Sequence, residues 1–206
     1  MARQAIAYID GHNFYHGVVK DCPDLKWLDV QALCERLLRG CNVTRVNYYT
    51  AKVIDFPTDP SQSQRQDTYL RALRTRPKIE VVLGQFQKKS KRVRLTSGHT
   101  AQAEIIEEKG SDVNLGTDLS WDASTRAMDV ALVISNDFDL QRPIDRAMAG
   151  GIEVIIVNPH HRSNRRPSVR GNDVRKLHRK DLSACQMPHI VLDLDGTELH
   201  RPGPWG

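Results

Sequence analysis

The chain lacks several features that would place it in large functional classes. No apolar run approaches the ~20 residues of a membrane-spanning helix, so no membrane role is expected. The four cysteines form no CxxC pair and no zinc-ligand spacing, which leaves buried or free thiols in a reducing compartment. The opening segment MARQAIAYID has a short apolar run that ends in an acid, unlike a secretory signal peptide. These absences predict a cytoplasmic protein.

Two further absences narrow the chemistry. The sequence has no glycine-rich phosphate loop, because Gly150-Gly151 lacks the GxxxxGK[ST] pattern. No Ser-His-Asp arrangement indicates a serine nucleophile. The length of 206 residues and the hydrophobic fraction of 39% fit one domain, with or without a tail.

Basic residues exceed acidic ones. The chain has 30 Lys and Arg against 25 Asp and Glu, a formal net charge of +5, and its isoelectric point is about 9.1. This balance favours a polyanionic partner.

Strand-like and helix-like segments alternate along the chain. Five β-branched or apolar runs predict strands, and they cover 4–9, 43–54, 79–86, 130–134 and 152–157. Amphipathic runs predict helices at 28–39, 61–76, from 111, and at 140–149. We also expect a hairpin tip at 88–92, a small helix at 173–182 and an extended tail. The alternation predicts an α/β domain with a mostly parallel sheet and right-handed crossovers.

Acids stand where this fold binds ligands. Asp10 closes the first strand, Asp137 follows the strand at 130–134, and Asp112 lies in the first turn of a helix. Carboxyl ends of parallel strands border the ligand crevice of an open α/β sheet. Acids that meet there repel one another unless a cation joins them. The sequence therefore predicts a divalent-metal site for Mg²⁺ or Mn²⁺.

Such a site suits phosphodiester hydrolysis. The ion neutralises the phosphate and activates an attacking water. Asp139 is a further candidate ligand, directly or through a water, and Asn13 could orient the water or a ligand carboxylate. Each acid also has a structural alternative, since Asp139 could cap the helix from Leu140 and Asp112 could complement its own helix dipole. The acids taken together favour the metal site.

Three segments resemble the NYN domain family, in its LabA-like branch of the PIN-like ribonucleases. They are YIDGHNFY at 8–15, EEKGSDVNL at 107–115 and VISNDFDL at 133–140, and the later segments 157–159 and 186–188 also fit. The resemblance implies a PIN-like three-layer sandwich with helices on both faces of the sheet. It also implies a divalent-metal site and RNA cleavage. The expected division is a catalytic domain at 1–160, with a basic loop, short helix and tail at 161–206 packing on it.

Several positions match the family motifs. Asp10, Asp112 and Asp137 fall on its acidic metal positions, and Asp139 matches a further acid. Asn13 matches the polar position beside the first acid. Asp118 occupies a position that is often acidic in such proteins. It follows Asp112 by six residues, however, which places it on another face of the helix. At position 138, similar proteins more often have a small polar residue, whereas this chain has Phe138.

Basic and aromatic residues supply candidate RNA contacts. The expected substrate contacts are Lys109, Ser135, Asn136, Tyr15, His12, Lys88, Lys89, Lys91 and Arg92. Ser135 and Asn136 are also expected to shape the turn that aims Asp137. Arg94 and the late-loop residues Arg162, Arg165, Arg166 and Arg170 extend this basic set. A run of charges can equally be a solvated surface, and His160-His161 is interpreted as part of a loop.

Three functions remain open at this point. The first is a metal-dependent ribonuclease that acts on RNA, and the second is a non-catalytic RNA- or protein-binding module with a structural cation. The third is a small-molecule phosphohydrolase, which a site closed by Tyr15 and Phe138 would favour. A homo-oligomer is possible through the tail around Trp205.

Overall fold

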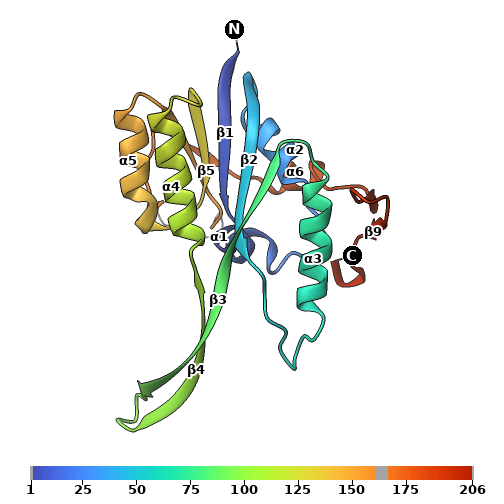
Figure 1. The fold of residues 1–206 in the computed structure, drawn as a ribbon, viewed down its shortest axis with the longest axis vertical. Coiled ribbons are helices and arrows are strands. Elements are labelled where there is room, and N and C mark those ends of the chain that lie inside the picture. Colours follow the sequence, from blue (N-terminus) through green and yellow to red (C-terminus); the bar gives the residue numbers. More distant parts are fainter. Residues whose placement is uncertain (1, 161–166, 206) are drawn as a thin grey trace.

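The computed structural model describes residues 2–160 and 167–205 and has three layers, with a central sheet between two sets of helices (Figure 1). Seven strands of these residues form one sheet in the order β4-β3-β2-β1-β5-β6-β7. The β3–β4 pair is antiparallel, and the other pairs are parallel. The strands are β1 (Arg3–Asp10), β2 (Cys41–Ala51), β3 (Ile79–Arg94), β4 (Thr100–Lys109), β5 (Val130–Ile134), β6 (Glu153–Asn158) and β7 (Asp173–Lys176).

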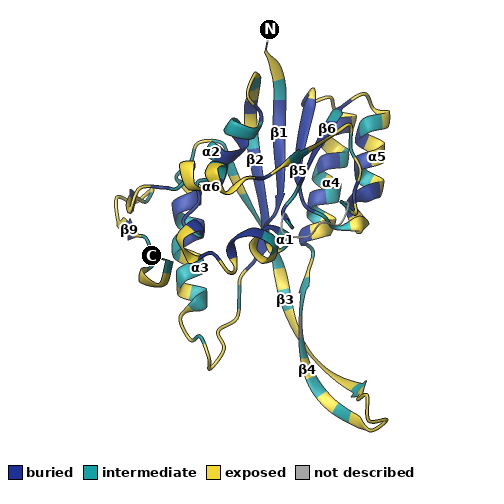
Figure 2. Cartoon of the chain, turned by 180° about the vertical axis from the view of Figure 1, so that it is seen from behind, coloured by how far each residue is buried: buried dark blue, intermediate teal, exposed yellow. Residues whose placement is uncertain are grey.

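Helices cover both faces of the sheet. Side chains alternate along β1, so Ala5, Ala7 and Ile9 face one set of helices and Ile6 and Tyr8 the other. Figure 2 shows the buried strands between these layers. The first face carries α1 (Gly11–Phe14), α2 (Val30–Leu37), α3 (Gln62–Arg74) and α6 (Arg179–Ala184), and the second carries α4 (Ser111–Ser124) and α5 (Gln141–Ala149). The predicted three-layer, mostly parallel fold is confirmed.

Local signals in the sequence explain several element ends. The Asp29 carboxylate accepts a hydrogen bond from the Ala32 amide at 3.0 Å and caps α2, as predicted. Gly110 precedes α4 with φ +99°, a left-handed conformation that glycine tolerates best. It turns the chain from β4 directly into the helix that carries Asp112.

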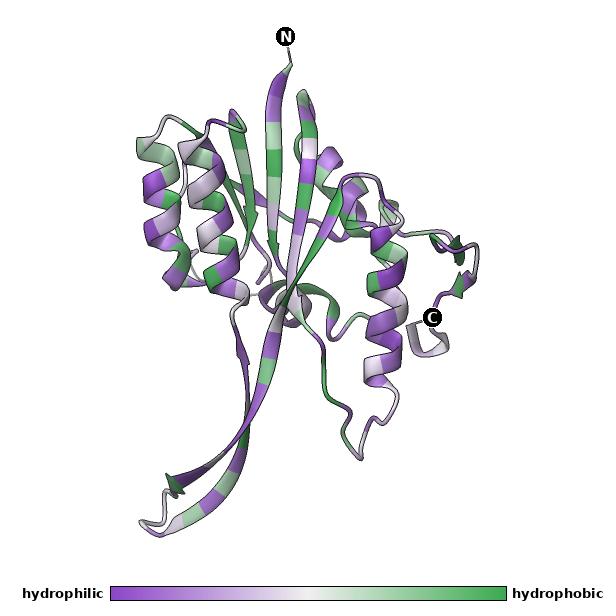
Figure 3. Ribbon diagram, in the orientation of Figure 1, coloured by the Kyte–Doolittle hydropathy of each residue, from purple (hydrophilic) through white to green (hydrophobic). Residues whose placement is uncertain are grey.

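The predicted hairpin tip at 88–92 was wrong. β3 continues through these residues to Arg94 and pairs with β4, so the connection falls at 95–99. The two strands form an arm that projects from the body of the protein (Figures 1 and 3). A solvent-exposed ribbon needs no apolar side chains on either face, so its lysine-rich sequence resembled a turn.

The segment after residue 170 also differs from the prediction. Residues 173–176 pair with β6 as an edge strand rather than starting a helix, and α6 begins only at Arg179. The tail contains a small hairpin, β8 (Ile190–Leu192) and β9 (Glu198–His200), and a 3₁₀ turn at Gly203–Trp205.

The last part of the chain packs on the main core. Leu182, Met187 and Leu199 belong to the same buried cluster as α2 and α3. The Trp205 ring lies 6.2 Å from that of Trp27, so this tryptophan packs within its own chain. Among residues 2–160 and 167–205, none of the helices is long and apolar enough to span a membrane.

Candidate active site

Two neighbouring strand ends are joined by one buried hydroxyl. Asp10 ends β1 at 3% exposure and accepts hydrogen bonds from the Asn13 amide at 2.9 Å and the Ser135 hydroxyl at 2.8 Å. The same Ser135 oxygen accepts from the Asp137 amide at 3.1 Å. Because β1 and β5 are adjacent and parallel, these residues meet at the carboxyl edge of the sheet.

Ser135 and Asn136 shape the loop. Ser135 has 0% exposure, so this geometry does not support its interpretation as a substrate contact, because its hydroxyl is used to hold Asp10. The Asn136 side chain forms two hydrogen bonds with Ser168. Its Nδ2 donates to the Ser168 hydroxyl at 3.2 Å, and its Oδ1 accepts from the Ser168 amide at 2.7 Å. The Asn136 amide also donates to the Asn13 Oδ1 at 3.2 Å. Both residues position Asp137.

Asp112 enters this site from α4. Partial burial and then the charges of Asp10, Asp137, Glu108 and Asp139 raise the pKa of Asp112 to about 6. Burial likewise raises the pKa of Asp10, against the hydrogen bonds from Asn13 and Ser135. The acids predicted to converge thus lie close enough to oppose each other's ionisation.

Glu108 is an acid of this site that the sequence analysis missed. It lies near the end of β4, and its Oε1 is buried without a hydrogen-bond partner within the described ranges. A Cβ added at Gly84 would lie 3.1 Å from this oxygen, so glycine there makes room for it. The pair Glu107-Glu108 could have indicated an acid near the site, but only the strand pairing shows which of the two residues faces it.

Asp139 does not cap the following helical turn. The cap is Asp137, whose Oδ1 accepts from the Asp139 amide at 3.0 Å. Asp139 is exposed, and its charge contributes to the raised pKa of Asp112. Phe138 between them is 65% exposed, so it does not turn into the core.

Histidines border the cluster. The His160 Nε2 lies 3.1 Å from the Asn13 Oδ1, because β1, β5 and β6 are consecutive parallel strands that end at the same edge of the sheet. The interpretation of His160 as a loop residue therefore missed that it lies close to the site. His161 lies outside the described residues. The rings of His12 and His16 are 4.5 Å apart, and His12 is exposed.

The other predicted contacts are dispersed. Tyr15 is 39% exposed at the start of the π-helical turn after α1. Lys109 pairs with Glu107 at 3.1 Å. Lys88 lies in the β3–β4 arm, where it pairs with Glu104 at 2.7 Å. The exposed arm residues Lys89, Lys91, Arg92 and Arg94 share that position.

Two remaining groups lie elsewhere. Arg162, Arg165 and Arg166 lie outside the described residues, and Arg170 lies beside α5, where its amide donates to the Gln141 Oε1 at 2.8 Å. Asp118 accepts from the Tyr49 hydroxyl at 2.9 Å, on another face of α4 as predicted.

The donor set suits a hard cation held partly through water. Among the residues that the structure describes, no group of three or more His, Cys, Asp or Glu side chains is arranged to hold a metal directly. Mg²⁺ keeps several of its waters and needs only one or two carboxylates. Asp112 and the buried Glu108 oxygen, neither with an ion pair among the described residues, supply oxygens of this kind. The residues present therefore fit a partly hydrated divalent ion.

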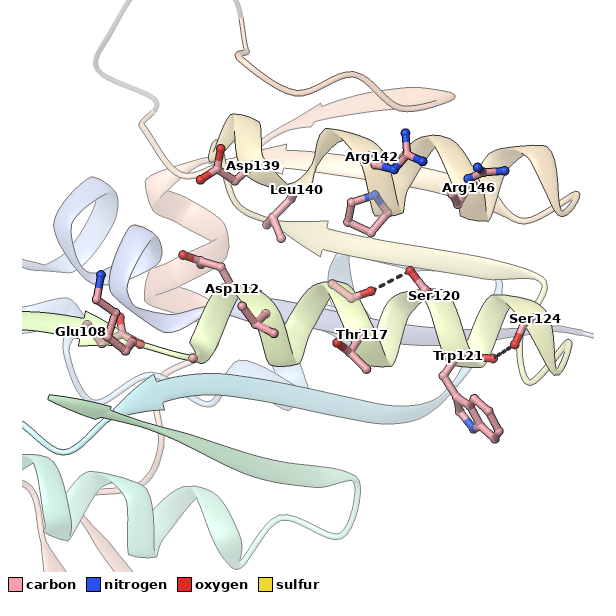
Figure 4. A pocket seen from close by; sticks show the side chains of 15 residues that line it. Glu108, Asp112, Thr117, Ser120, Trp121, Ser124, Asp139, Leu140, Arg142 and Arg146 are labelled. Carbon is pink, nitrogen blue, oxygen red and sulfur yellow. Dashed lines mark hydrogen bonds between the residues drawn. The ribbon is translucent and has the colours of Figure 1, made fainter. Parts of the chain in front are cut away.

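A groove starts at these acids and runs between α4 and α5. Its volume is about 840 Å³. Glu108, Asp112 and Asp139 lie at one end, whereas Trp121 and Arg146 lie toward the other (Figure 4).

The burial of Asp112 and the charges of the neighbouring acids predict a pH-dependent stability in metal-free protein. Since its folded pKa of about 6 exceeds its ordinary value of 3.8, ionisation is harder in the folded state. The stability associated with this carboxyl is full below pH 3.8 and is lost as pH rises through about 6. After allowance for solvent screening, wild type should lose about 1 kcal/mol relative to Asp112→Asn between pH 4 and 7.5.

Urea unfolding of both proteins in EDTA at the two pH values measures this difference. Added Mn²⁺ or Mg²⁺ should restore the loss only in wild type. Equal pH dependence of the two proteins would contradict the inferred repulsion.

The comparisons identify the family to which this α/β fold belongs. Residues 5–170 match the family model of the NYN domain. The chain therefore belongs to the NYN domain family, within the PIN-like superfamily. Its assignment to the LabA-like branch stays a prediction.

Two individual proteins are similar to the chain. The first, from Pseudomonas putida, is named 6-hydroxy-3-succinoylpyridine 3-monooxygenase HspA; it is 29% identical over 89% of this chain and 70% of its own length. The second is the crystal structure of a protein of unknown function, VPA0982, from Vibrio parahaemolyticus. It superposes with a TM-score of 0.51 at 15% identity, over 86% of this chain and 94% of its own, and this likeness concerns the fold alone.

Proposed function

We propose that this NYN domain is a divalent-metal-dependent ribonuclease. The observation that carries the proposal is Asp112, whose carboxyl lies where other acids oppose its ionisation. A cation relieves that repulsion and attracts a phosphodiester to the same place. Asp112 and Glu108 would hold a partly hydrated ion directly, and Asp10, Asp137 and Asp139 would bind it through its water molecules. When bound, the ion supplies a Lewis acid that neutralises the phosphate and activates the attacking water.

The surrounding residues orient the reacting groups. Ser135 holds Asp10 and Asp137 in one arrangement through its hydroxyl. Asn13 presents its Oδ1 to the Asn136 amide and to His160, which keeps the loops around the acids together. Phe138, 65% exposed beside Asp137, is placed to stack on an unpaired base.

RNA is the proposed substrate. The family suggests it, and the net charge of +5 suits a polyanion. The small-molecule phosphohydrolase is less well supported, because Tyr15 and Phe138 are exposed and do not close the site. The non-catalytic module with a structural cation remains the alternative that an assay must separate. A cytoplasmic location and a homo-oligomer stay predictions.

A second candidate comes from the similarity to the Pseudomonas putida protein. Its printed name describes oxygenation of a pyridine derivative, and the similarity covers most of both chains. Incubation with 6-hydroxy-3-succinoylpyridine, O₂ and a reduced nicotinamide, followed by mass spectrometry for a hydroxylated product, tests this activity.

Metal-stripped protein with end-labelled single-stranded RNA tests the proposal directly. We expect no cleavage in EDTA and cleavage after Mn²⁺ or Mg²⁺ is added. Asp137→Asn protein, purified in parallel, is expected to lose cleavage, although Asn retains an acceptor for the Asp139 amide. RNA binding without cleavage across several sequences would favour the binding module, and equal cleavage by Asp137→Asn would remove Asp137 from the mechanism.

A further inference from the structure

The groove between α4 and α5 is not needed to hold the metal, yet it opens directly onto the acids. We propose that it binds the single-stranded RNA segment that flanks the scissile phosphate, an inference that rests on the proposed ribonuclease function. Its volume of about 840 Å³ is shared by both helices. At about 1.5 Å per residue, Trp121 lies about 14 Å along α4 from Asp112, enough for a few nucleotides.

The floor of the groove is built by a close helix contact. Gly116 on α4 faces Pro143 on α5, and a Cβ added at Gly116 would lie 3.3 Å from the proline Cγ. The opposite side of α4 is packed into the core, where Leu115 and Leu119 have 0% exposure. The groove is therefore a fixed feature of two packed helices and not a gap between mobile loops.

The α5 side of the groove carries two arginines on one helix face. Arg142 and Arg146 are four residues apart, so they share one helix face and both line the groove (Figure 4). Both are exposed, and neither has an ion pair within the described part of the chain. Their neighbour Asp145 accepts a hydrogen bond from Gln141 at 2.7 Å instead. Two unneutralised guanidinium groups fit phosphate oxygens.

The α4 side offers a stacking surface. Trp121 is 68% exposed and lines the groove, although an indole of this size is usually largely buried. Ser120 and Ser124 flank it, and their hydroxyls donate to helix carbonyls at 2.7 Å. Stacking on an exposed aromatic is the usual way to bind unpaired bases without sequence preference.

Charge complementarity decides the occupant. The groove runs from carboxylates, where a cation would hold the scissile phosphate, to arginines that attract the next phosphates. An RNA strand presents phosphates at regular intervals and bases for stacking, so one ligand satisfies both walls.

Fluorescence titration with a uridine oligonucleotide in EDTA measures binding apart from cleavage. Trp27 is fully buried, and Trp205 packs against it outside the groove, so quenching should come mainly from Trp121. We expect Trp121→Ala to weaken binding about 5- to 100-fold, measured by anisotropy of a labelled oligonucleotide. Arg142→Ala/Arg146→Ala should weaken it about 10-fold and lower the log–log salt slope by about 1.4, at 0.7 per lost phosphate contact.

The matched control is Arg39→Ala/Arg74→Ala. It removes the same charge from two exposed arginines outside the groove, and all variants are compared at equal helical content. Groove variants that bind like this control would overturn the inference, as would a dimer that dissociates in the groove variants with RNA binding unchanged. Groove binding without metal-dependent cleavage would instead remove the proposed ribonuclease function, so the two failures are distinct.

Discussion

Replacement of Asp112 with Asn is expected to lower metal-stimulated RNA cleavage by about 10²–10³-fold. Partial burial and then the charges of neighbouring acids raise the pKa of Asp112, so a bound cation would favour its ionised form. The amide keeps the size of the side chain but removes the charge that attracts the ion. Single-turnover cleavage rates at saturating Mn²⁺ and Mg²⁺ measure the loss.

Asp118→Asn is the matched control for this experiment. Asp118 lies on the same helix but accepts a hydrogen bond from Tyr49, and an amide oxygen can still accept it. We expect cleavage within about twofold of wild type. Cleavage by Asp112→Asn at the same rate as this control would show that α4 contributes no acid to the mechanism.

Replacement of Asp122 with Ala is expected to destabilise the fold by roughly 2 to 4 kcal/mol. Asp122 is 5% exposed, accepts from the Tyr8 hydroxyl at 2.6 Å and pairs with Arg45. Its loss would leave the hydroxyl buried without its acceptor and the guanidinium without its carboxylate. The free energy of unfolding from urea titration measures the effect.

Asp67→Ala provides the comparison. Asp67 is exposed on α3, and alanine favours a helix, so this change should shift the free energy of unfolding by less than about 0.5 kcal/mol. If both variants unfolded at the same urea concentration, the buried network would not link α4 to the sheet in the way its contacts indicate.

Local sequence patterns were sufficient to predict the main strands, one helix start and the positions of two acids. A run such as Val130–Ile134 is short, β-branched and apolar on both faces, which predicts a central strand. Asp29 before an amphipathic segment predicted a helix start, which its hydrogen bond to Ala32 confirms. The positions of Asp10 and Asp137 after two such strands were enough to predict that they lie together, because parallel strands end at one edge.

Side chains that depend on strand register or helix packing were not predictable. Glu108 rather than Glu107 faces Asp112, since the β3–β4 pairing determines which residue of the doublet turns inward. His160 approaches Asn13 because β1, β5 and β6 are consecutive strands whose carboxyl ends lie at one edge of the sheet. Such contacts join residues far apart in the chain, and no periodicity within one segment encodes them.

The β3–β4 arm and the groove between α4 and α5 show most clearly which features the sequence could predict and which it could not. The lysine-rich residues of β3 resembled a turn because a ribbon with solvent on both faces needs no alternation of apolar side chains. Trp121 and Arg146 are unremarkable in sequence, and they become one surface only when Gly116 lets α5 pack against α4. Alternating hydrophobicity thus determined the layers and the place of the acids, whereas the packing of two helices decided where a strand of RNA could lie.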